Sequence, residues 1–249
     1  MERRDRTSLA AFCTADETLV LGAAVTLGED AARHMAVRRI ATGDSIRLLD
    51  GRGSVADATV IRLSRNMAAA QVERVSVETP LPPVHLLVPI ADRDRMLWLA
   101  EKATELAVTS WRPVLWKRSR SVKPRGEGPV FMARVRQRMM HALEQCGGSW
   151  LPAIYPDATC ERAMTGTADG AKLVLDAGGD AIMTALPSTA PVTLAVGPEG
   201  GFDPSELDAL SLAGFRRVRL EGYTLRFETA ATVGLALARA ALHPLPGAV

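Results

Sequence analysis

The first third of the chain consists of short apolar or alternating runs that are separated by turn residues. Residues 45–63 carry two such runs on either side of Asp50-Gly51, and residues 68–78 carry another. Two β-type runs that flank an Asp-Gly pair predict a hairpin. The residues that follow are rich in proline, which interrupts the hydrogen bonding of a sheet. We therefore predict a small β-rich domain over residues 1–78.

Beyond this boundary, strand-like runs alternate with helical patterns. Met96 and Leu99 begin a helical repeat, and Asp92 or Asp94 can cap that helix. Alternation of strands and helices predicts a mostly parallel sheet with helices on both faces. We predict this α/β domain over residues 79–249. Its expected strands are residues 84–90, 113–116, 172–177, 192–196 and 216–220. A second expected helix carries Phe131, Val135, Met139, Ala142 and Cys146 on one face.

A glycine-rich turn, GPEGG, occupies residues 197–201 and is followed by a well-signalled helix. Asp203 can cap this helix, Pro204 suits its first position, and Glu206 can complete a capping box. Gly214 predicts its end. The turn therefore lies between a strand and the amino end of a helix, where open α/β sheets bind ligands. Glycine lets the backbone approach a ligand closely, although the same residues could serve only to turn the chain.

Two further polar loops with glycine follow expected strands. Residues 175–180, LDAGGD, form one of them. Residues 220–226 form the other, which carries Arg226 and precedes Glu228 and an alanine-rich apolar helix. The chain lacks GxxxxGK[ST], and GPEGG is not GxGxxG, which disfavours a nucleoside triphosphate or a dinucleotide. Three such loops in one half of the chain could line a single crevice.

Composition limits the partners and the location. Hydrophobic residues make up 47% of the 249 residues and the net charge is only +2, so overall charge does not indicate a polyanionic partner. The three cysteines show no CxxC spacing and the four histidines show no HExxH spacing, which favours a reducing compartment and disfavours a metal site. No apolar run approaches the roughly 20 residues of a membrane span. We expect a cytoplasmic protein without membrane or metal.

One segment is strongly basic in spite of the low net charge. Residues 112–138 contain nine Lys or Arg and one acidic residue, Glu127. Such a segment is typical of a surface that contacts phosphates, although a solvated loop and helix face has the same composition. Trp111, Trp116 and Trp150 flank it and could stack on a base, but the core is the more common place for tryptophan.

The glycine turn and the loop after it resemble the signature of a known family. GPEGG, Glu206 and the LxxxxLRxETA pattern over residues 220–230 are similar to the ribosomal small-subunit methyltransferase E family of the SPOUT superfamily. The likeness covers most of the chain. Four upstream elements resemble the family in the same order: VRRIATGD at 37–44, EKATELAV at 101–108, KRS at 117–119 and EQCGG at 144–148.

Members of this family methylate N3 of a uridine in 16S ribosomal RNA. The resemblance therefore implies a PUA-like β-barrel that binds RNA over residues 1–78, and a SPOUT α/β domain over residues 79–249 that is closed by a trefoil knot. It implies S-adenosylmethionine held in the knot and a homodimer whose interface helps to form the active site. The implied partner is 16S ribosomal RNA or the small ribosomal subunit. The alternatives are a divergent SPOUT enzyme with another RNA target and a non-catalytic RNA-binding assembly factor.

The matched positions imply roles for individual residues. Arg226 is the first candidate for a cation that stabilises the uridine ring when N3 loses its proton, and Glu199 and Glu228 are weaker candidates for the base. A structural ion pair of Arg226 with either glutamate is the competing interpretation. The cofactor-binding candidates are Leu175, Gly178, Val196, Gly197, Pro198, Glu199, Gly200, Gly201, Leu220, Gly222, Leu225 and Thr229. The RNA-binding candidates are Arg38, Arg39, Lys117, Arg118, Arg120 and Lys123.

Several positions depart from the family pattern. Glu221 stands where the family has glycine, with Gly222 one place later, and Tyr223 stands where arginine is common. Gly148 replaces the arginine of EQxGR, and Ala107 replaces the glycine of ELGV. The cofactor turn is largely intact, whereas the positions expected to face RNA differ more. The sequence therefore does not determine which base is the target.

Overall fold

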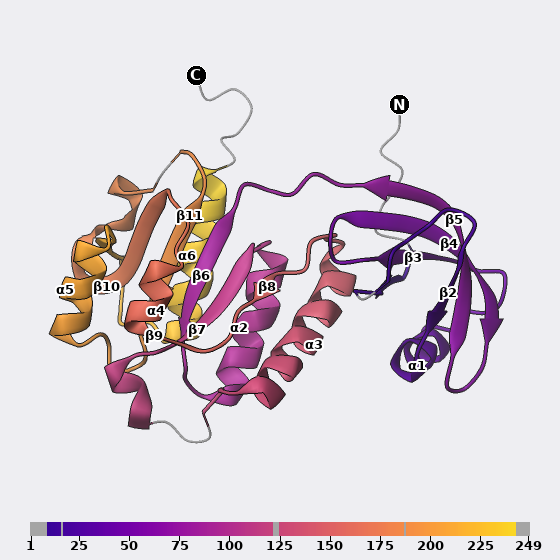
Figure 1. Ribbon diagram of the computed structural model, residues 1–249, viewed down its shortest axis with the longest axis horizontal. Helices are drawn as coiled ribbons and strands as arrows, with labels where there is room; N and C mark the ends of the chain where they lie inside the picture. The colour runs from indigo at the N-terminus through magenta and orange to yellow at the C-terminus, as the bar shows by residue number, and fades with distance from the viewer. Residues whose placement is uncertain (1–8, 16, 122–124, 187, 243–249) are drawn as a thin grey trace. The chain divides into compact units, whose positions relative to one another are not determined.

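The computed structural model divides into two units, each with its own sheet (Figure 1). It describes residues 9–15, 17–121, 125–186 and 188–242. The first unit comprises residues 1–80 and 140–151, and the second comprises residues 81–139 and 152–249. Residues 140–151 join the first unit although they follow a long stretch of the second, which the sequence pattern does not predict.

The first unit contains a five-stranded mixed sheet with the order β1-β3-β4-β5-β2. Its strands pair antiparallel except for β1 and β3, which are parallel. The predicted hairpin is confirmed as β3 and β4, and the Asp50 carboxylate shapes its turn by accepting from the backbone N–H groups of Arg52 and Ser54 at 2.7 and 2.8 Å. The elements are β1 (Ala11–Cys13), β2 (Ala24–Leu27), α1 (Glu29–Val37), β3 (Ser45–Leu49), β4 (Ser54–Leu63) and β5 (Ala68–Val77).

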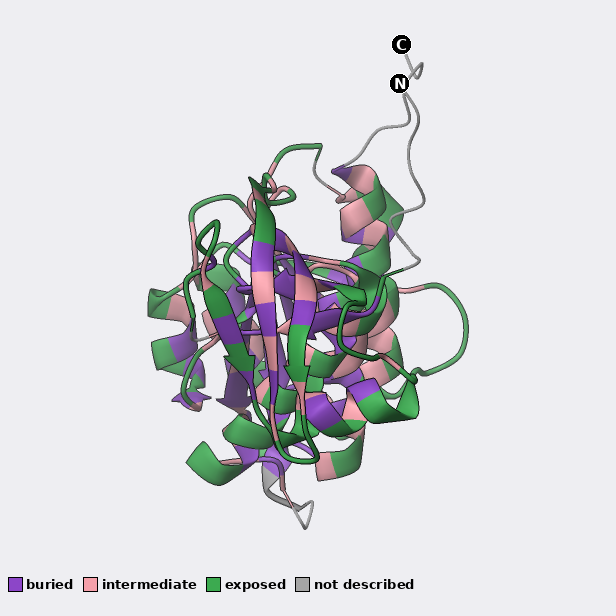
Figure 2. Ribbon diagram, turned by 90° about the vertical axis from the view of Figure 1, so that its right-hand side faces the viewer, coloured by how far each residue is buried: buried purple, intermediate pink, exposed green. Residues whose placement is uncertain are grey.

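Alternating residues of these strands form the core of the first unit. Ala56, Ala58 and Val60 of β4 are buried, while the intervening Asp57 and Thr59 are half-buried. Figure 2 shows this alternation along the long strands of the unit. Because successive side chains of a strand point to opposite faces, one face packs on the core and the other meets solvent.

The second unit contains a seven-stranded sheet with the order β12-β10-β11-β6-β7-β8, and β9 also pairs with β7. All of these pairs are parallel, so the predicted parallel sheet is confirmed. The strands are β6 (Val84–Pro89), β7 (Ser110–Leu115), β8 (Ala153–Ile154), β9 (Ala158–Thr159), β10 (Ala171–Ala181), β11 (Val192–Val196) and β12 (Arg216–Arg219). The helices of the second unit are α2 (Arg93–Glu105), α4 (Cys160–Thr165), α5 (Pro204–Leu212) and α6 (Phe227–Ala241), with 3-10 turns η1 (Lys117–Ser121) and η2 (Ile182–Thr184). Helix α3 (Pro129–Cys146) begins in the second unit, and its residues 140–146 belong to the first.

Helices cover both faces of this parallel sheet. On one face, Ala163 of α4 and Leu210 of α5 share a buried cluster with Val174 and Ala195 of the sheet. On the other face, α6 packs against β6 and β11, and α2 packs against α6. Gly234 allows α6 to lie close to the sheet, since a Cβ there would stand 2.9 Å from the Leu194 side chain. Strands buried on both faces explain why their sequences are continuous apolar runs.

Two details of the expected helices are decided by the structure. Asp92 is the N-cap of α2, and its carboxylate accepts from the backbone N–H groups of Asp94 and Arg95 at 3.1 Å. The expected helix with Phe131 and Cys146 is confirmed as α3, in which Phe131 is buried and Cys146 is exposed. Cys146 is the last helical residue, and Gly147 then turns the chain with φ of +71°.

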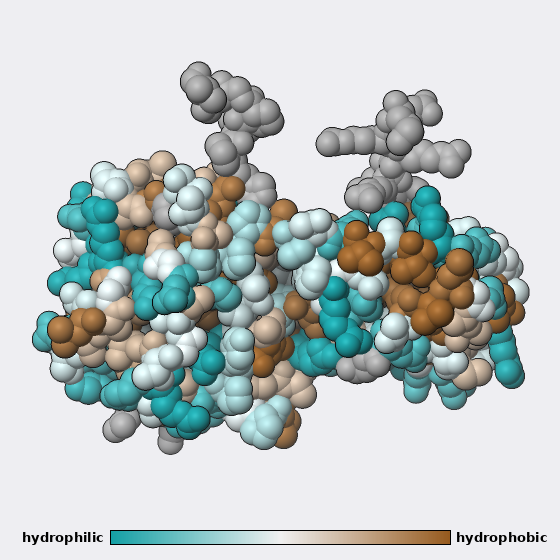
Figure 3. Space-filling model, turned by 45° about the horizontal axis from the view of Figure 1, so that its top comes forward, coloured by the Kyte–Doolittle hydropathy of each residue, from teal (hydrophilic) through white to brown (hydrophobic). Residues whose placement is uncertain are grey.

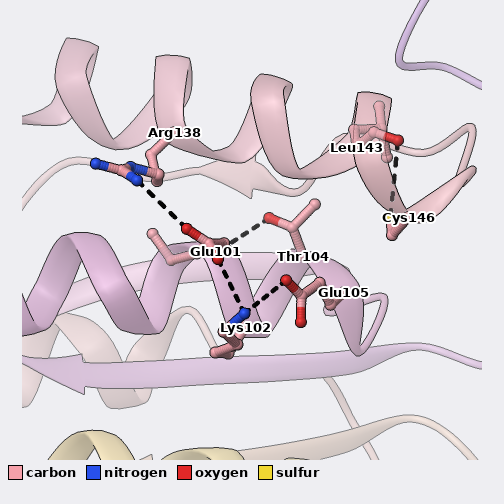
Figure 4. A network of polar contacts seen from close by, with 8 residues as sticks. Glu101, Lys102, Thr104, Glu105, Arg138, Leu143 and Cys146 are labelled. Atoms are coloured by element: carbon pink, nitrogen blue, oxygen red, sulfur yellow. Dashed lines mark hydrogen bonds and ion pairs between the residues drawn. The ribbon is translucent and has the colours of Figure 1, made fainter. Parts of the chain in front are cut away.

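A small polar network lies on α2 and connects it to α3 (Figure 4). Lys102 contacts the carboxylates of Glu101 and Glu105 at 2.9 and 2.8 Å, and Arg138 of α3 reaches Glu101 at 3.3 Å. The hydrogen bond from Lys102 is the largest cause that lowers the pKa of Glu101. These side chains are partly exposed, so water and salt screen their contacts and each contributes little to stability.

Much of the surface seen in Figure 3 is hydrophilic, with smaller patches of hydrophobic residues between. Among the described residues, no helix is long and apolar enough to cross a membrane.

Ala107 has a left-handed backbone, with φ of +54°, at the place where the resembled family has glycine. This conformation costs a non-glycine residue about 1–2 kcal/mol, and glycine loses about 0.5–1 kcal/mol of entropy. Ala107→Gly is therefore expected to raise the free energy of unfolding by up to about 1 kcal/mol, measured by urea denaturation. Ala103→Gly, in the interior of α2, is the matched control and should lower it by about 1 kcal/mol. A destabilised Ala107→Gly protein would contradict the prediction.

Candidate functional site

A cavity of about 380 Å³ opens at the middle of β10, beside the segments that follow β11 and β12. Its volume lies within the range of small-molecule sites, and its place matches the crevice that open parallel sheets use for ligands. Three stretches of chain line it, together with two residues of α6. The lining residues are Leu175, Asp176, Ala177, Val196, Gly197, Pro198, Glu199, Gly201, Phe202, Arg219, Leu220, Glu221, Gly222, Tyr223, Thr224, Leu225, Phe227 and Ala230.

The protein's own atoms explain why the GPEGG turn carries no bulky side chains. A Cβ at Gly197 would stand 2.8 Å from the ring of Phe202, and one at Gly200 would stand 3.3 Å from Cβ of Arg118. Gly201 has φ of +69°, a conformation that side chains disfavour. The turn is therefore compact because neighbouring side chains pack onto it. The turn also lines the cavity, with Gly197, Pro198, Glu199 and Gly201 in the lining.

A buried tryptophan holds the strand end that precedes the turn. Trp116 is fully buried, and its indole N–H donates to the backbone oxygen of Val196 at 3.0 Å. Its ring also meets the ring of Phe202 edge to face, with 4.8 Å between centroids. The expectation of buried tryptophans is confirmed for Trp111 and Trp116, but Trp150 is 40% exposed.

Glu206 connects the KRS segment to the helix after the turn. Its carboxylate is buried and accepts from the backbone N–H groups of Lys117 and Asp203 at 2.7 and 2.9 Å. The second bond completes the predicted capping box of α5. The Lys117 ammonium reaches Ser205, and Arg118 donates to the backbone oxygen of Gly200 at 2.9 Å. Lys117 and Arg118, which the sequence predicts as RNA contacts, therefore also contact the start of α5 and the GPEGG turn, respectively.

The interpretation of residues 175–180 as a loop after a strand is wrong. They belong to β10, which pairs with β12 before and after a register shift between Leu175 and Asp180. Gly179 lies against the backbone of β12, where a Cβ would stand 2.5 Å from Val218 N. Close approach of two strands therefore explains this glycine. Only the start of the stretch, residues 175–177, lines the cavity.

The segment between β12 and α6 forms another wall of the cavity. Gly222 has φ of +115°, which explains a glycine at this place, and the side chain of Tyr223 is almost fully exposed. Arg219 donates to the backbone oxygen of Gly179 at 2.8 Å and reaches Glu221 at 3.2 Å. Within the described part of the chain, the backbone N–H groups of residues 221–225 have no hydrogen-bond partner, so they remain available to a ligand.

The two acidic candidates share one cation that the sequence did not single out. Arg95 of α2 forms an ion pair with Glu199, and its Nε lies 3.9 Å from the carboxylate of Glu228. Arg226 is exposed, and its side chain makes no hydrogen bond or ion pair with any described residue, whereas its backbone oxygen accepts from Ala230 N–H at 2.8 Å. The competing interpretation, in which Arg226 pairs with either glutamate, is therefore wrong for this structure. Glycine and proline marked the turn, but no local signal marks Arg95, because its partners lie far along the chain.

The sequence candidates divide into those that line the cavity and those that do not. Gly178, Gly200 and Thr229 do not line it, and neither do Arg226 and Glu228. The candidates that line it are Leu175, Val196, Gly197, Pro198, Glu199, Gly201, Leu220, Gly222 and Leu225. The lining residues that the sequence did not single out are Asp176, Ala177, Phe202, Arg219, Glu221, Tyr223, Thr224, Phe227 and Ala230.

Comparisons with known proteins agree with this architecture. A model of an RNA methyltransferase domain matches residues 77–239, and a model of an RNA methyltransferase PUA domain matches residues 27–73. The ribosomal RNA small subunit methyltransferase E of Mycobacterium bovis is 31% identical over 222 residues, which cover 85% of this chain and 84% of that protein. The chain belongs to the ribosomal RNA small subunit methyltransferase E family. The Synechocystis member is 30% identical over 235 residues, 90% of this chain and 75% of that protein.

Solved structures of similar proteins share the fold. The ribosomal RNA small subunit methyltransferase E of Neisseria gonorrhoeae, bound to S-adenosyl methionine, has a TM-score of 0.81 at 29% identity and covers 92% of this chain and 95% of its own. A methyltransferase of Legionella pneumophila, in complex with the same cofactor, has a TM-score of 0.83 at 25% identity, with 94% and 98% covered.

The RNA-binding candidates of this methyltransferase E family member lie in both units. Arg38 and Arg39 are exposed at the end of α1, and Arg39 has φ of +58°. Lys117 and Arg118 are exposed on η1. The side chain of Arg120, and Lys123 as a whole, lie outside the described residues. Among the residues that the structure describes, no group of three or more His, Cys, Asp or Glu could hold a metal ion.

Proposed function

We propose that this protein transfers a methyl group from S-adenosylmethionine to N3 of a uridine in 16S ribosomal RNA of the small subunit. The observation that carries the proposal is the cavity of about 380 Å³, whose walls are the GPEGG turn and the segment that leads to the LRxETA helix. Both are signature elements of the family. The Neisseria and Legionella relatives, which share the fold, were solved with this cofactor bound.

The cavity suits the parts of this cofactor. Leu175, Val196, Leu220 and Leu225 supply apolar surface for the adenine and the methionine chain. The free backbone N–H groups of residues 221–225 can bind its polar atoms. A cavity of this kind, mostly apolar with a few polar groups, is typical of cofactor sites.

The chain's own residues would position the RNA base and manage its proton. S-adenosylmethionine supplies an electrophilic methyl group, so the protein's main task is to align the two reactants. The Arg226 side chain has no hydrogen-bond or ion-pair partner among the described residues, so its guanidinium can stabilise negative charge on the uridine ring. Glu199 and Glu228 are the candidates that accept the N3 proton, and their pairing with Arg95 keeps them close to the cavity.

The assembly and the location are part of the same proposal. We propose a homodimer whose interface completes the active site, a trefoil knot around the cofactor, and a cytoplasmic location. Partly exposed apolar side chains on α2 and α6, Trp98 and Val233, support a second copy as the partner of this face. The residues 1–78 are proposed as the PUA-like RNA-binding domain and the residues 79–249 as the SPOUT domain.

One observation favours a second candidate, a methyltransferase of the same type with another RNA target. Tyr223 lies in the lining of the cavity and is 96% exposed, at a place where the family commonly has arginine. An aromatic ring stacks on bases, whereas an arginine also pairs with phosphates. This change could alter which nucleotide is presented to the cavity.

The proposal is tested by methylation of small ribosomal subunits that lack the N3-methyluridine of 16S RNA. The purified protein and S-adenosylmethionine are added, and the RNA is digested and analysed by mass spectrometry of its nucleosides. We expect 3-methyluridine in 16S RNA, and no incorporation into subunits that already carry the modification. A different methylated nucleoside would favour the second candidate, and absence of both methylation and cofactor binding would leave an RNA-binding assembly factor.

A further inference from the structure

We propose that Arg95 is a positioning residue that clamps two walls of the cofactor cavity to each other. This inference rests on the proposed function for its effect on catalysis. Its physical core, the ordering of two segments by one guanidinium, is independent of the ligand. Arg95 does not line the cavity, so it acts through residues that belong to the walls.

The position of Arg95 follows from the order of the strands. β6 and β11 are neighbours in the sheet, so the helix after β6 begins beside the turn after β11. Arg95 lies in the first turn of that helix, α2, which Asp92 anchors by capping. Its side chain therefore extends from a capped helix to the GPEGG turn and to the first turn of α6. This is the arrangement expected of a residue that positions others.

The two partners of Arg95 belong to different walls of the cavity. Glu199 is the central residue of the GPEGG turn and lines the cavity. Glu228 lies in the first turn of α6, one residue after Phe227, which also lines the cavity. The segment 220–226 ends where this helix begins, so holding Glu228 in place fixes the end of that segment.

Charge and burial show why the clamp depends on this cation. One guanidinium faces two carboxylates, and the Glu228 side chain is only 13% exposed. The second oxygen of Glu228, Oε2, is buried and has no hydrogen-bond partner among the described residues. Without Arg95, a nearly buried carboxylate would lose its cation and would repel Glu199. Both walls would then move apart or become less ordered.

Lys102 provides a matched control on the same helix. Like Arg95 it contacts two carboxylates, those of Glu101 and Glu105, and the exposed fractions of the two cations are similar, 27% and 31% (Figure 4). Neither Lys102 nor its partners line the cavity. Loss of either cation should therefore affect α2 similarly, whereas only loss of Arg95 should affect the cavity.

The experiment compares Arg95→Met, Arg95→Lys and Lys102→Met with the unchanged protein. Hydrogen exchange of the ligand-free proteins measures the order of residues 197–203 and 220–230. Calorimetry measures the affinity for S-adenosylmethionine, and methylation kinetics separate KM for the cofactor from kcat. Arg95→Met is expected to speed hydrogen exchange in both segments. It should also weaken cofactor binding and raise KM for the cofactor, each by about ten-fold. A ten-fold change corresponds to about 1.4 kcal/mol.

Arg95→Lys is expected to lie in between, because a single ammonium can pair with one carboxylate but lacks the fork that spans two. In Lys102→Met, the exchange rates of the two segments and KM for the cofactor should stay within about two-fold of the values of the unchanged protein. Unchanged exchange and KM in Arg95→Met, or equal changes in Lys102→Met, would overturn the inference. If Arg95→Met does not fold, the comparison of Arg95→Lys with Lys102→Met tests the inference by the same two measurements. If the protein without substitutions neither binds the cofactor nor methylates RNA, the proposed function is wrong. The hydrogen-exchange data would still test whether Arg95 orders the two segments.

Discussion

Replacing Arg226 with alanine is expected to slow methylation by about 10²–10³-fold, the effect of removing one preorganised group that stabilises developing charge. Uridine N3 loses its proton during the reaction, and a cation beside the ring lowers the cost of the resulting negative charge. Arg226 is exposed, and its side chain has no hydrogen-bond or ion-pair partner among the described residues, so its loss removes no packing and no ion pair. Cofactor affinity and melting temperature should therefore stay the same. Single-turnover methylation and calorimetry with S-adenosylmethionine measure the two effects separately.

The matched control for this prediction is Arg162→Ala. Arg162 is an exposed arginine of α4 that does not line the cavity, so its loss should leave the methylation rate within about two-fold. Arg226→Lys tests whether charge alone is enough, because lysine keeps the charge without the planar fork. An Arg226→Ala protein with normal cofactor binding and the full rate would remove Arg226 from the mechanism.

Glu206→Leu is expected to lower the free energy of unfolding by about 2–5 kcal/mol, because two backbone N–H groups lose a buried acceptor at a cost of about 1–3 kcal/mol each. These are the N–H groups of Lys117 and Asp203. The same change releases the KRS segment from the helix that follows GPEGG, so the affinity for S-adenosylmethionine should also fall. Urea denaturation and calorimetry provide the two measurements.

Asp208→Leu on the same helix is the control, since Asp208 is exposed and its replacement should change stability by no more than about 0.5 kcal/mol. Glu206→Gln should have an intermediate effect, because its amide oxygen can still accept one of the two bonds. If Glu206→Leu were as stable as Asp208→Leu, the carboxylate would not hold these two segments together.

Local patterns were sufficient to predict many of the strands and helices of this fold. The Asp50-Gly51 hairpin, the apolar strands of the second unit and the capping box of Asp203 and Glu206 all involve residues close in sequence. Their signals are periodicity, turn chemistry and capping, which depend on neighbours within a few positions. The parallel arrangement followed from the alternation of strands and helices.

The sequence identified the glycines at which bare backbone matters, but not the neighbouring atoms that require a glycine there. Gly179 allows β10 to approach β12, and Gly197 leaves room for the ring of Phe202. The sequence suggested a ligand as the reason for bare backbone at both places. A glycine shows that something lies close, and only the tertiary structure shows which atoms these are.

The sequence by itself determined the family signature, many of the strands and helices, and half of the residues that line the cavity, because capping, turn chemistry and periodicity depend on short-range order. Only the tertiary structure decided that Arg95 holds Glu199, at a separation of 104 positions, and that Trp116 binds the end of β11. Such pairings arise from the order of strands in the sheet and from the burial of polar groups that must find partners. Strand order and long-range polar pairing produce no periodic pattern along the sequence from which they could be predicted.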